Sequence, residues 1–251
     1  PIALNHFADA GHTMRMVAGR PVVAFQSTSQ GGLWVAHTGV ELPDDLADWN
    51  IHQVDPGNIA EVSSVVDHGG RIAVSTVGGP SFDALVVALA QVNTPSVAQD
   101  WALHRVDGPG VFGSSMVRHR GKLAATYAKN GSYHVALAKV DQPAFGSDWN
   151  RMDLLIPVSG NIGRTISTQG KLALVYPMIS GFCEVCPLGE TLPNELRIAW
   201  NATAAPTSAL DWQTAQITEL PMSNLLVANN GATLLVAGTP DFFFPGGGRG
   251  E

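Results

Sequence analysis

The most regular feature of the chain is an apolar run that recurs after a glycine, which we call the glycine marker. Each run is about six residues long, and this length with polar flanks predicts a buried β-strand. The runs are RPVVAF from Arg20, RIAVSTV from Arg71, KLAATYA from Lys122, KLALVYP from Lys171 and ATLLVAG from Ala232. Another strand-like segment precedes the glycine, as in EVSSVVDH from Glu61. Each glycine is therefore expected in a hairpin turn.

Two more segments complete each repeat. A third apolar strand follows, as in DALVVALAQV from Asp83, and a tryptophan opens the fourth strand. These tryptophans are Trp49, Trp101, Trp149 and Trp212. The glycine marker recurs at Gly19, Gly70, Gly121, Gly170 and Gly231, with spacings of 51, 51, 49 and 61 residues. Four short strands within a period near fifty predict an all-β protein, a β-propeller of four-stranded antiparallel blades, with five blades.

We expect a single propeller domain over residues 1–251. Its repeats lie near 10–55, 56–107, 108–157, 158–219 and 220–251. The last repeat has 32 residues and lacks the tryptophan, so it needs a further strand. Residues 1–9 resemble a fourth strand and would close the last blade, which removes exposed sheet edges. The alternative is that the ring continues in sequence beyond this chain.

An aspartate stands before each of the four tryptophans. A tryptophan at the same place in every blade is expected to lie between neighbouring sheets, where it buries roughly 150–250 Å². The aspartate is expected to accept hydrogen bonds from backbone N–H groups of the preceding turn. His52 and His104 follow the tryptophan by three residues in successive blades. We expect these histidines to face solvent rather than bind a metal, because outer strands expose alternate positions.

The repeat resembles those of sialidase-type and related bacterial neuraminidase propellers. The resemblance rests on an apolar strand, a Gly-basic turn and a tryptophan opening the last strand, in DDLADW, SVAQDW, FGSDW and TSALDW. The family's Asp box is Ser-x-Asp-x-Gly-x-Thr-Trp. Here the aspartate stands directly against the tryptophan, and the glycine and threonine are missing. The resemblance implies a propeller fold and does not extend to sialidase activity.

Composition narrows the classes of partner. The chain has 251 residues, 45% of them hydrophobic and 14% charged, which suits a folded domain with a sizeable core. The formal charge is −7, and the 14 lysines and arginines are scattered, so a nucleic-acid partner is not expected. No apolar run approaches the roughly 20 residues of a membrane-spanning helix. We expect no membrane insertion.

The fourth repeat carries an insertion of about ten residues that contains both cysteines, Cys183 and Cys186. The pair could be half of a zinc site, a redox pair or a local disulfide. No second cysteine pair accompanies it, and Pro187 follows in a loop-like segment, so the disulfide is favoured. A disulfide implies an extracellular, periplasmic or cell-surface location. The sequons at Asn130 and Asn201 agree with export from a eukaryotic cell.

Candidate binding residues come from aligning the first strands of the repeats, which converge on the propeller axis. The alignment places His12, Ser63, Ser114, Gly163 and Asn224 at one equivalent position, with Glu61 and Arg164 beside it. Six of them form the predicted ligand site at the channel and rim, namely His12, Glu61, Ser63, Ser114, Arg164 and Asn224. We expect no metal, no cofactor and no catalytic residue. His12 and a serine could belong to a catalytic triad, but no acid is placed to orient the histidine. A glycosidase needs two carboxylates on either side of the substrate, whereas Glu61 and Asp67 lie in the same blade.

The sequence therefore favours a non-catalytic exported recognition or scaffold module that binds a glycan or a protein through one rim. In this role the module could be part of a larger polypeptide or of a surface assembly. The alternative is a carbohydrate-active hydrolase, a glycosidase whose acids come from loops that the alignment does not reach.

Overall fold

The computed structural model describes most of the chain as β-strand. The described residues are 12–27, 31–57, 59–79, 81, 83–158, 163–179, 194–203, 206–218, 222–229 and 234–240. They form four four-stranded antiparallel sheets and one two-stranded sheet, and in each the strands pair in chain order. No helix among them is long and apolar enough to span a membrane.

The strand bounds repeat from sheet to sheet. The first sheet holds β1 (His12–Val17), β2 (Arg20–Gln26), β3 (Leu33–Thr38) and β4 (Trp49–Asp55). The second holds β5 (Ile59–His68), β6 (Arg71–Gly78), β7 (Ala84–Ala90) and β8 (Trp101–Asp107). The third holds β9 (Val111–His119), β10 (Lys122–Lys129), β11 (Ser132–Ala138) and β12 (Trp149–Pro157). The fourth holds β13 (Arg164–Thr168), β14 (Lys171–Ile179), β15 (Asn194–Asn201) and β16 (Trp212–Thr218), and β17 (Met222–Asn229) pairs with β18 (Leu234–Pro240).

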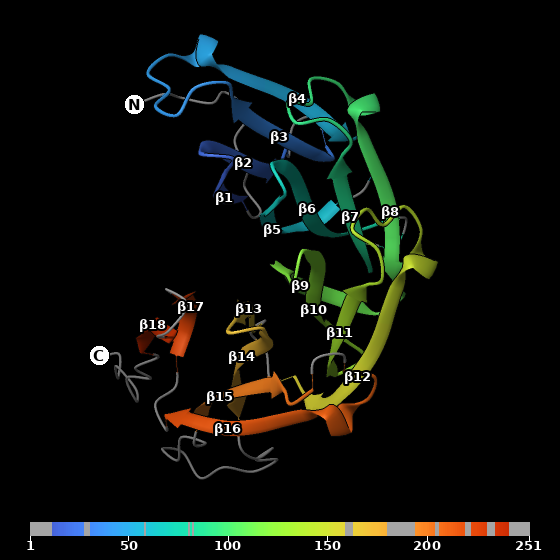
Figure 1. Cartoon of the computed structure of the whole chain (residues 1–251), viewed down its shortest axis with the longest axis vertical. Coiled ribbons are helices and arrows are strands. Elements are labelled where there is room, and N and C mark those ends of the chain that lie inside the picture. Colours follow the sequence, from blue (N-terminus) through green and yellow to red (C-terminus); the bar gives the residue numbers. More distant parts are fainter. Residues whose placement is uncertain are drawn as a thin grey trace, which may run out of the picture.

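The sheets are arranged side by side around a common centre. Figure 1 shows β4, β8, β12 and β16 on the outside of the arc and the first strand of each sheet toward its inside. Strand β1 contacts β5, β5 contacts β9, β9 contacts β13 and β13 contacts β17. Radial four-stranded antiparallel meanders are the architecture of a β-propeller, so the predicted fold class is confirmed.

The glycine marker lies in a two-residue turn between the first and second strands. Both turn residues have positive φ, as at Ala18 and Gly19 (48° and 78°) and at Arg120 and Gly121 (50° and 83°). This combination defines a type I′ turn, whose twist matches that of the flanking strands and which favours glycine at its second position. The predicted hairpins at Gly19, Gly70, Gly121 and Gly170 are confirmed, and Gly231 lies outside the described residues. We call this end of the blades the lower rim, and the end with the second-to-third and fourth-to-first connections the upper rim.

Each aspartate of the Asp-Trp pairs ends a short 3₁₀ helix just before the fourth strand. These helices are η1 (Leu46–Asp48), η2 (Ala98–Asp100), η3 (Gly146–Asp148) and η4 (Ala209–Asp211). Asp148 Oδ2 accepts hydrogen bonds from the backbone N–H groups of Ala144 and Phe145 at 2.9 and 3.0 Å. Asp48, Asp100 and Asp211 make the same pair of bonds. The predicted role of the aspartate is confirmed.

The tryptophans of the second, third and fourth sheets pack against the preceding sheet. Trp101 Nε1 donates to His52 Nε2 at 2.9 Å, and the ring centres of Trp149 and His104 lie 6.0 Å apart. Trp212 shares a buried cluster with Met152. The predicted position between sheets is confirmed for these three tryptophans, whereas Trp49 of the first sheet is only half-buried. The prediction that His52 and His104 face solvent is wrong, since they are 8% and 7% exposed. Alternation along a strand does not tell which face meets the next sheet.

The hydrophobic core is divided into layers, each between two neighbouring sheets. Side chains of the first and second sheets form one cluster, those of the second and third form another, and those of the third and fourth form a third. The second strands of the second and third sheets are buried on both faces, because each of these two sheets has a neighbour on either side, and this explains their continuous apolar runs.

Several sequence predictions fall outside the described residues. These are the closing segment 1–9, the cysteines Cys183 and Cys186, and the chain beyond Pro240. They remain predictions.

Candidate functional site

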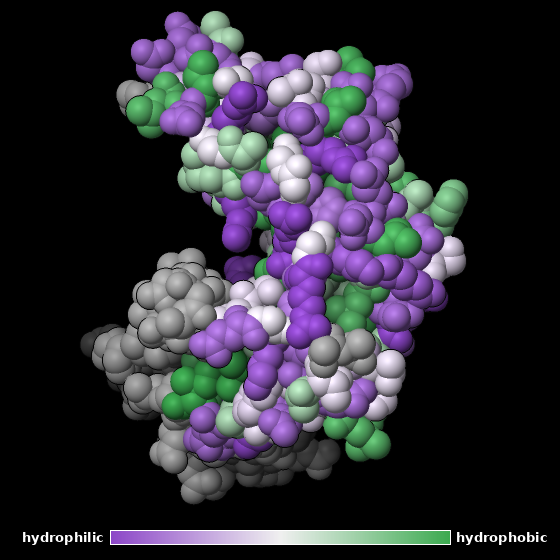
Figure 2. Space-filling view, in the orientation of Figure 1, coloured by the Kyte–Doolittle hydropathy of each residue, from purple (hydrophilic) through white to green (hydrophobic). Residues whose placement is uncertain are grey.

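An axial channel of about 270 Å³ lies where the inner strands of the first four sheets meet. Polar side chains dominate its wall. The lining residues are Thr13, Met14 and Arg15 on β1, Ser63, Ser64 and Val65 on β5, Ser115, Met116 and Val117 on β9, and Arg164 and Thr165 on β13. Figure 2 shows hydrophilic side chains at the edge of the hollow inside the arc of sheets.

Hydroxyl groups on the channel wall link consecutive inner strands. Ser64 Oγ accepts a hydrogen bond from the backbone N–H of Met116 at 3.0 Å. Ser115 Oγ accepts one from the backbone N–H of Thr165 at 2.9 Å, and Thr165 Oγ1 donates to the Ser115 carbonyl at 2.8 Å. Consecutive inner strands belong to different sheets and share no backbone ladder, so these side chains supply hydrogen bonds between them. They connect β5, β9 and β13 along the channel wall.

Ser63 differs from its neighbours in having no such bond. Ser63 lines the channel and is 7% exposed, and its Oγ has no hydrogen-bond partner among the described residues. The cause is local, because the pairing of β5 with β6 shifts register between Val62 and Ser64 and leaves Ser63 at a β-bulge. A buried hydroxyl without a partner costs on the order of 1–3 kcal/mol. A ligand group in the channel could recover that energy.

Glu61 and Arg164 lie at the upper end of the channel, near the starts of β5 and β13. Burial raises the pKa of the half-buried Glu61 carboxyl, and the Arg164 charge partly offsets this effect. The carboxyl therefore keeps its proton to a higher pH than an ordinary glutamate does. Such a group can donate a proton or hydrogen-bond a sugar hydroxyl.

The predicted site residues fall into three groups. Ser63 and Arg164 line the channel, and Glu61 interacts with Arg164. Ser114 is buried beside the channel wall, where its Oγ donates to Ser75 Oγ at 3.3 Å, and His12 is an exposed residue at the start of β1. Asn224 lies on β17, and its side chain is outside the described part of the structure.

Sequence reasoning missed several channel residues. Thr13, Ser64 and Ser115 occupy one register position, as the pairing with the second strands shows, and Arg164 occupies the same position on β13. This position is one residue later than the one that the alignment selected. The signal was present in the recurrence of small polar residues at both positions. The chain alone could not show which of the two faces the axis.

The comparisons with known proteins concern the fold. No protein-family model matches the sequence, and no curated protein sequence matches it. Among solved structures, the phage phi92 endosialidase matches with a TM-score of 0.53 and 12% identity over 82% of this chain. The match covers 42% of the endosialidase chain, so this chain spans less than half of that protein's length. A β-propeller fold is shared.

Two glycoside hydrolases give lower scores. An α-L-arabinofuranosidase from Clostridium thermocellum matches with a TM-score of 0.47 and 13% identity, over 91% of this chain and 80% of its own. A thermostable family-43 glycoside hydrolase matches with a TM-score of 0.49 and 13% identity, over 92% and 82% of the two chains. By their names, these three structural neighbours are carbohydrate-active enzymes.

Proposed function

We propose that this protein binds a glycan at the upper end of the axial channel and hydrolyses it, with Glu61 as the proton donor. The observation that carries the proposal is the Glu61 carboxyl, whose pKa is raised by burial beside a polar channel. Ser63 adds a buried hydroxyl that has no hydrogen-bond partner among the described residues, and Arg164 adds a cation on β13. The fold shared with an endosialidase supports this proposal over a role without catalysis.

The chemistry begins with proton transfer to the oxygen that links two sugars. As the carbon–oxygen bond breaks, the Glu61 proton moves to the leaving oxygen, and water attacks the sugar carbon directly or after a carboxylate nucleophile. Glu61 can act only while protonated, so hydrolysis should be lost as the pH rises through its raised pKa. The Arg164 charge would stabilise the Glu61 carboxylate that the transfer leaves.

A second carboxylate is needed for either mechanism. On the described inner strands the other carboxylate is Asp67, which accepts the backbone N–H groups of Gly70 and Ala18 at 2.8 and 2.9 Å. Both partners lie in lower-rim turns, which identifies Asp67 as a turn-stabilising residue. The second acid would have to come from a connection at the upper rim.

The polar channel beside Glu61 also supports a second candidate function, which is glycan recognition without turnover. A channel with one carboxylate, two arginines and several hydroxyl groups can hydrogen-bond a sugar without cleaving it. For either function, we also propose that the protein is exported and that Cys183 and Cys186 form a disulfide.

One experiment separates these candidates. The protein and its Glu61→Gln variant would be tested on a glycan array and on a panel of chromogenic glycosides, with Glu41→Gln as the matched control at an exposed position. We expect turnover that falls about 10²- to 10⁴-fold in Glu61→Gln and stays unchanged in Glu41→Gln. Binding without turnover, weakened by Ser63→Ala, would establish the recognition module instead. The absence of both binding and turnover would refute the proposal.

A further inference from the structure

A second hollow, unrelated to the axial channel, opens on the lower rim between the third and fourth sheets. Its volume is about 520 Å³, within the range of small-molecule sites. Leu137 and Leu172 form apolar wall, and Arg120, Lys122 and Lys139 bring three cations to its lining. Among the described residues of that lining there is no carboxylate.

Backbone carbonyl groups hold the side chains of these cations in place. Lys122 Nζ donates to the Lys139 carbonyl at 2.5 Å, Lys139 Nζ donates to the Ser147 carbonyl at 2.8 Å, and Arg120 Nε donates to the Gly170 carbonyl at 2.9 Å. Within the part of the chain that the structure describes, neither lysine forms an ion pair. The charges of Lys122 and Lys139 are thus held in place on a chain of net charge −7, and the Lys139 charge also acts on the nearby Asp148 carboxyl.

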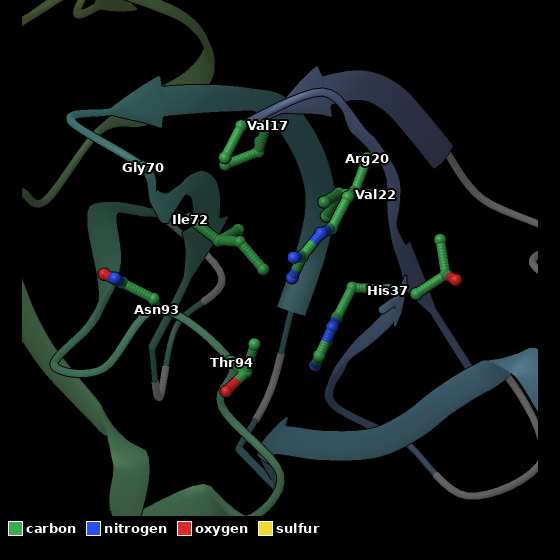
Figure 3. Close-up of a pocket in the computed structure, with 10 residues that line it drawn as sticks. Val17, Arg20, Val22, His37, Gly70, Ile72, Asn93 and Thr94 are labelled. Carbon is green, nitrogen blue, oxygen red and sulfur yellow. The ribbon is translucent and has the colours of Figure 1, made fainter. Parts of the chain in front are cut away.

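The equivalent hollow between the first and second sheets is only about 150 Å³. Figure 3 shows His37 and Arg20 pointing into it. His37 Nε2 lies 2.5 Å from the Pro95 carbonyl oxygen, so the imidazole bridges β3 to the connection before η2 and occupies the space.

No histidine makes this bridge at the larger hollow. Strand pairing places Leu137 where the first sheet has His37, and Pro206 stands five residues before Asp211 as Pro95 stands before Asp100. Between the second and third sheets His68 contacts the Asp141 carbonyl instead. Its counterpart His119 hydrogen-bonds Ser167 Oγ at 2.9 Å, within the neighbouring inner strand. A histidine thus bridges the two sheets at each of the first two interfaces, and the described residues make no such bridge at the third, where the hollow is cationic.

We propose that this hollow binds the anionic group of a sugar phosphate or sugar sulfate. A phosphate or sulfate monoester would accept charge-assisted hydrogen bonds from Lys122 and Lys139. The half-buried Leu137 side chain suits the carbon face of a sugar ring, and the exposed Asn150 amide at the edge can hydrogen-bond its hydroxyl groups. This site lies on the rim opposite to the channel mouth with Glu61, so it is independent of the proposed hydrolysis.

The test is calorimetric titration with glucose 6-phosphate and glucose 6-sulfate, using glucose as the neutral probe. We expect saturable binding of at least one ester, with affinity that falls as NaCl is added because exposed charges are screened. A Lys122→Gln/Lys139→Gln double variant should lose about tenfold or more in affinity. Whichever ester binds identifies the anion.

Two further variants serve as controls. Lys171→Gln removes the cation at the Lys122 position of the fourth sheet, outside this lining, and should change the affinity less than twofold. Leu137→His should fill the hollow and abolish binding without removing any charge, and its thermal unfolding would verify that it folds. Binding that survives in the double variant, binding that falls equally in Lys171→Gln, or equal binding of glucose would overturn the proposal. So would the absence of binding by both esters.

Discussion

At the scale of single residues, buried aromatic and imidazole rings join one sheet to the next. Trp101 is 6% exposed, and its Nε1 donates to His52 Nε2. The other ring nitrogen of His52, Nδ1, lies 3.0 Å from Asn50 Oδ1. This arrangement requires the neutral imidazole with its proton on Nδ1. The pair therefore contributes both packing area and a pH-sensitive hydrogen bond to the same interface.

Replacing Trp101 with alanine should lower the free energy of unfolding by about 3–5 kcal/mol, because it opens a void between two sheets. Trp101→Phe is the matched control, since it keeps most of the apolar contact and loses the N–H donor. Its loss should be clearly smaller. Denaturant unfolding would measure both. A loss below about 1 kcal/mol for the alanine variant would mean that the ring does not support the interface.

The pH dependence of stability follows from His52. Burial, and then the neighbouring His37, lower its pKa from 6.5 to about 4. The folded protein thus binds this proton less readily than the unfolded chain, so the contribution is complete above pH 6.5 and is lost as the pH falls toward 4. The loss should reach at most about 3 kcal/mol.

Unfolding measured across this pH range would show the effect, and His52→Gln should flatten it because glutamine can accept the Trp101 N–H bond without titrating. A stability profile of the variant that matches the parent protein would assign the pH dependence to other groups.

At the scale of elements, the recurring unit is a 3₁₀ turn that ends in aspartate and leads into the fourth strand. The aspartate binds two backbone N–H groups through one oxygen, and its own carbonyl accepts the N–H of the residue just after the third strand, as from Lys139 to Asp148 at 2.7 Å. The turn thereby sets where the fourth strand begins and which face carries the tryptophan.

Asp148→Ala should lower the unfolding temperature by removing both acceptor bonds, and Asp148→Asn should restore most of it because the amide oxygen can still accept them. The backbone hydrogen bonds lower the pKa of Asp148, so this stabilisation is present above the pKa of an unfolded aspartate and is lost as the pH falls through the lowered value. Differential scanning calorimetry of the three proteins would check the order. Equal unfolding temperatures would remove the aspartate from the capping role.

Much of the fold was predictable at the scale of elements, and the candidate site was only partly so. Period and turn chemistry are local, so the hairpins at Gly19 and Gly121 could be located from the chain. The burial of His104 depends on a neighbouring sheet about fifty residues away in sequence, and the partnerless Ser63 depends on a bulge. The lower-rim hollow follows from a histidine that the third sheet lacks, which a single repeat could not reveal.

At the scale of the whole molecule, stability depends on every sheet having a neighbour. The two-stranded fifth sheet contacts the fourth through β13, β14 and β15. A propeller that ends in an incomplete blade would present unpaired strand edges, which favour aggregation. The segment 1–9 remains our predicted closing strand.

Deleting residues 1–9 should therefore lower the unfolding temperature and the solubility, although it removes no cysteine and no residue of the proposed sites. Deletion of residues 245–251 is the control and should change neither. Thermal unfolding and light scattering would measure both. If the first deletion also changes nothing, the ring is completed by other sequence or by another subunit.

The central claim is that a glycan binds at the upper end of the axial channel. A crystal structure of the protein with an oligosaccharide identified on the array would test it most directly. We predict that the sugar contacts Ser63 and Arg164, with Glu61 within hydrogen-bond distance of a glycosidic oxygen. A sugar bound on the outer strands, or elsewhere with the channel wall untouched, would contradict the claim.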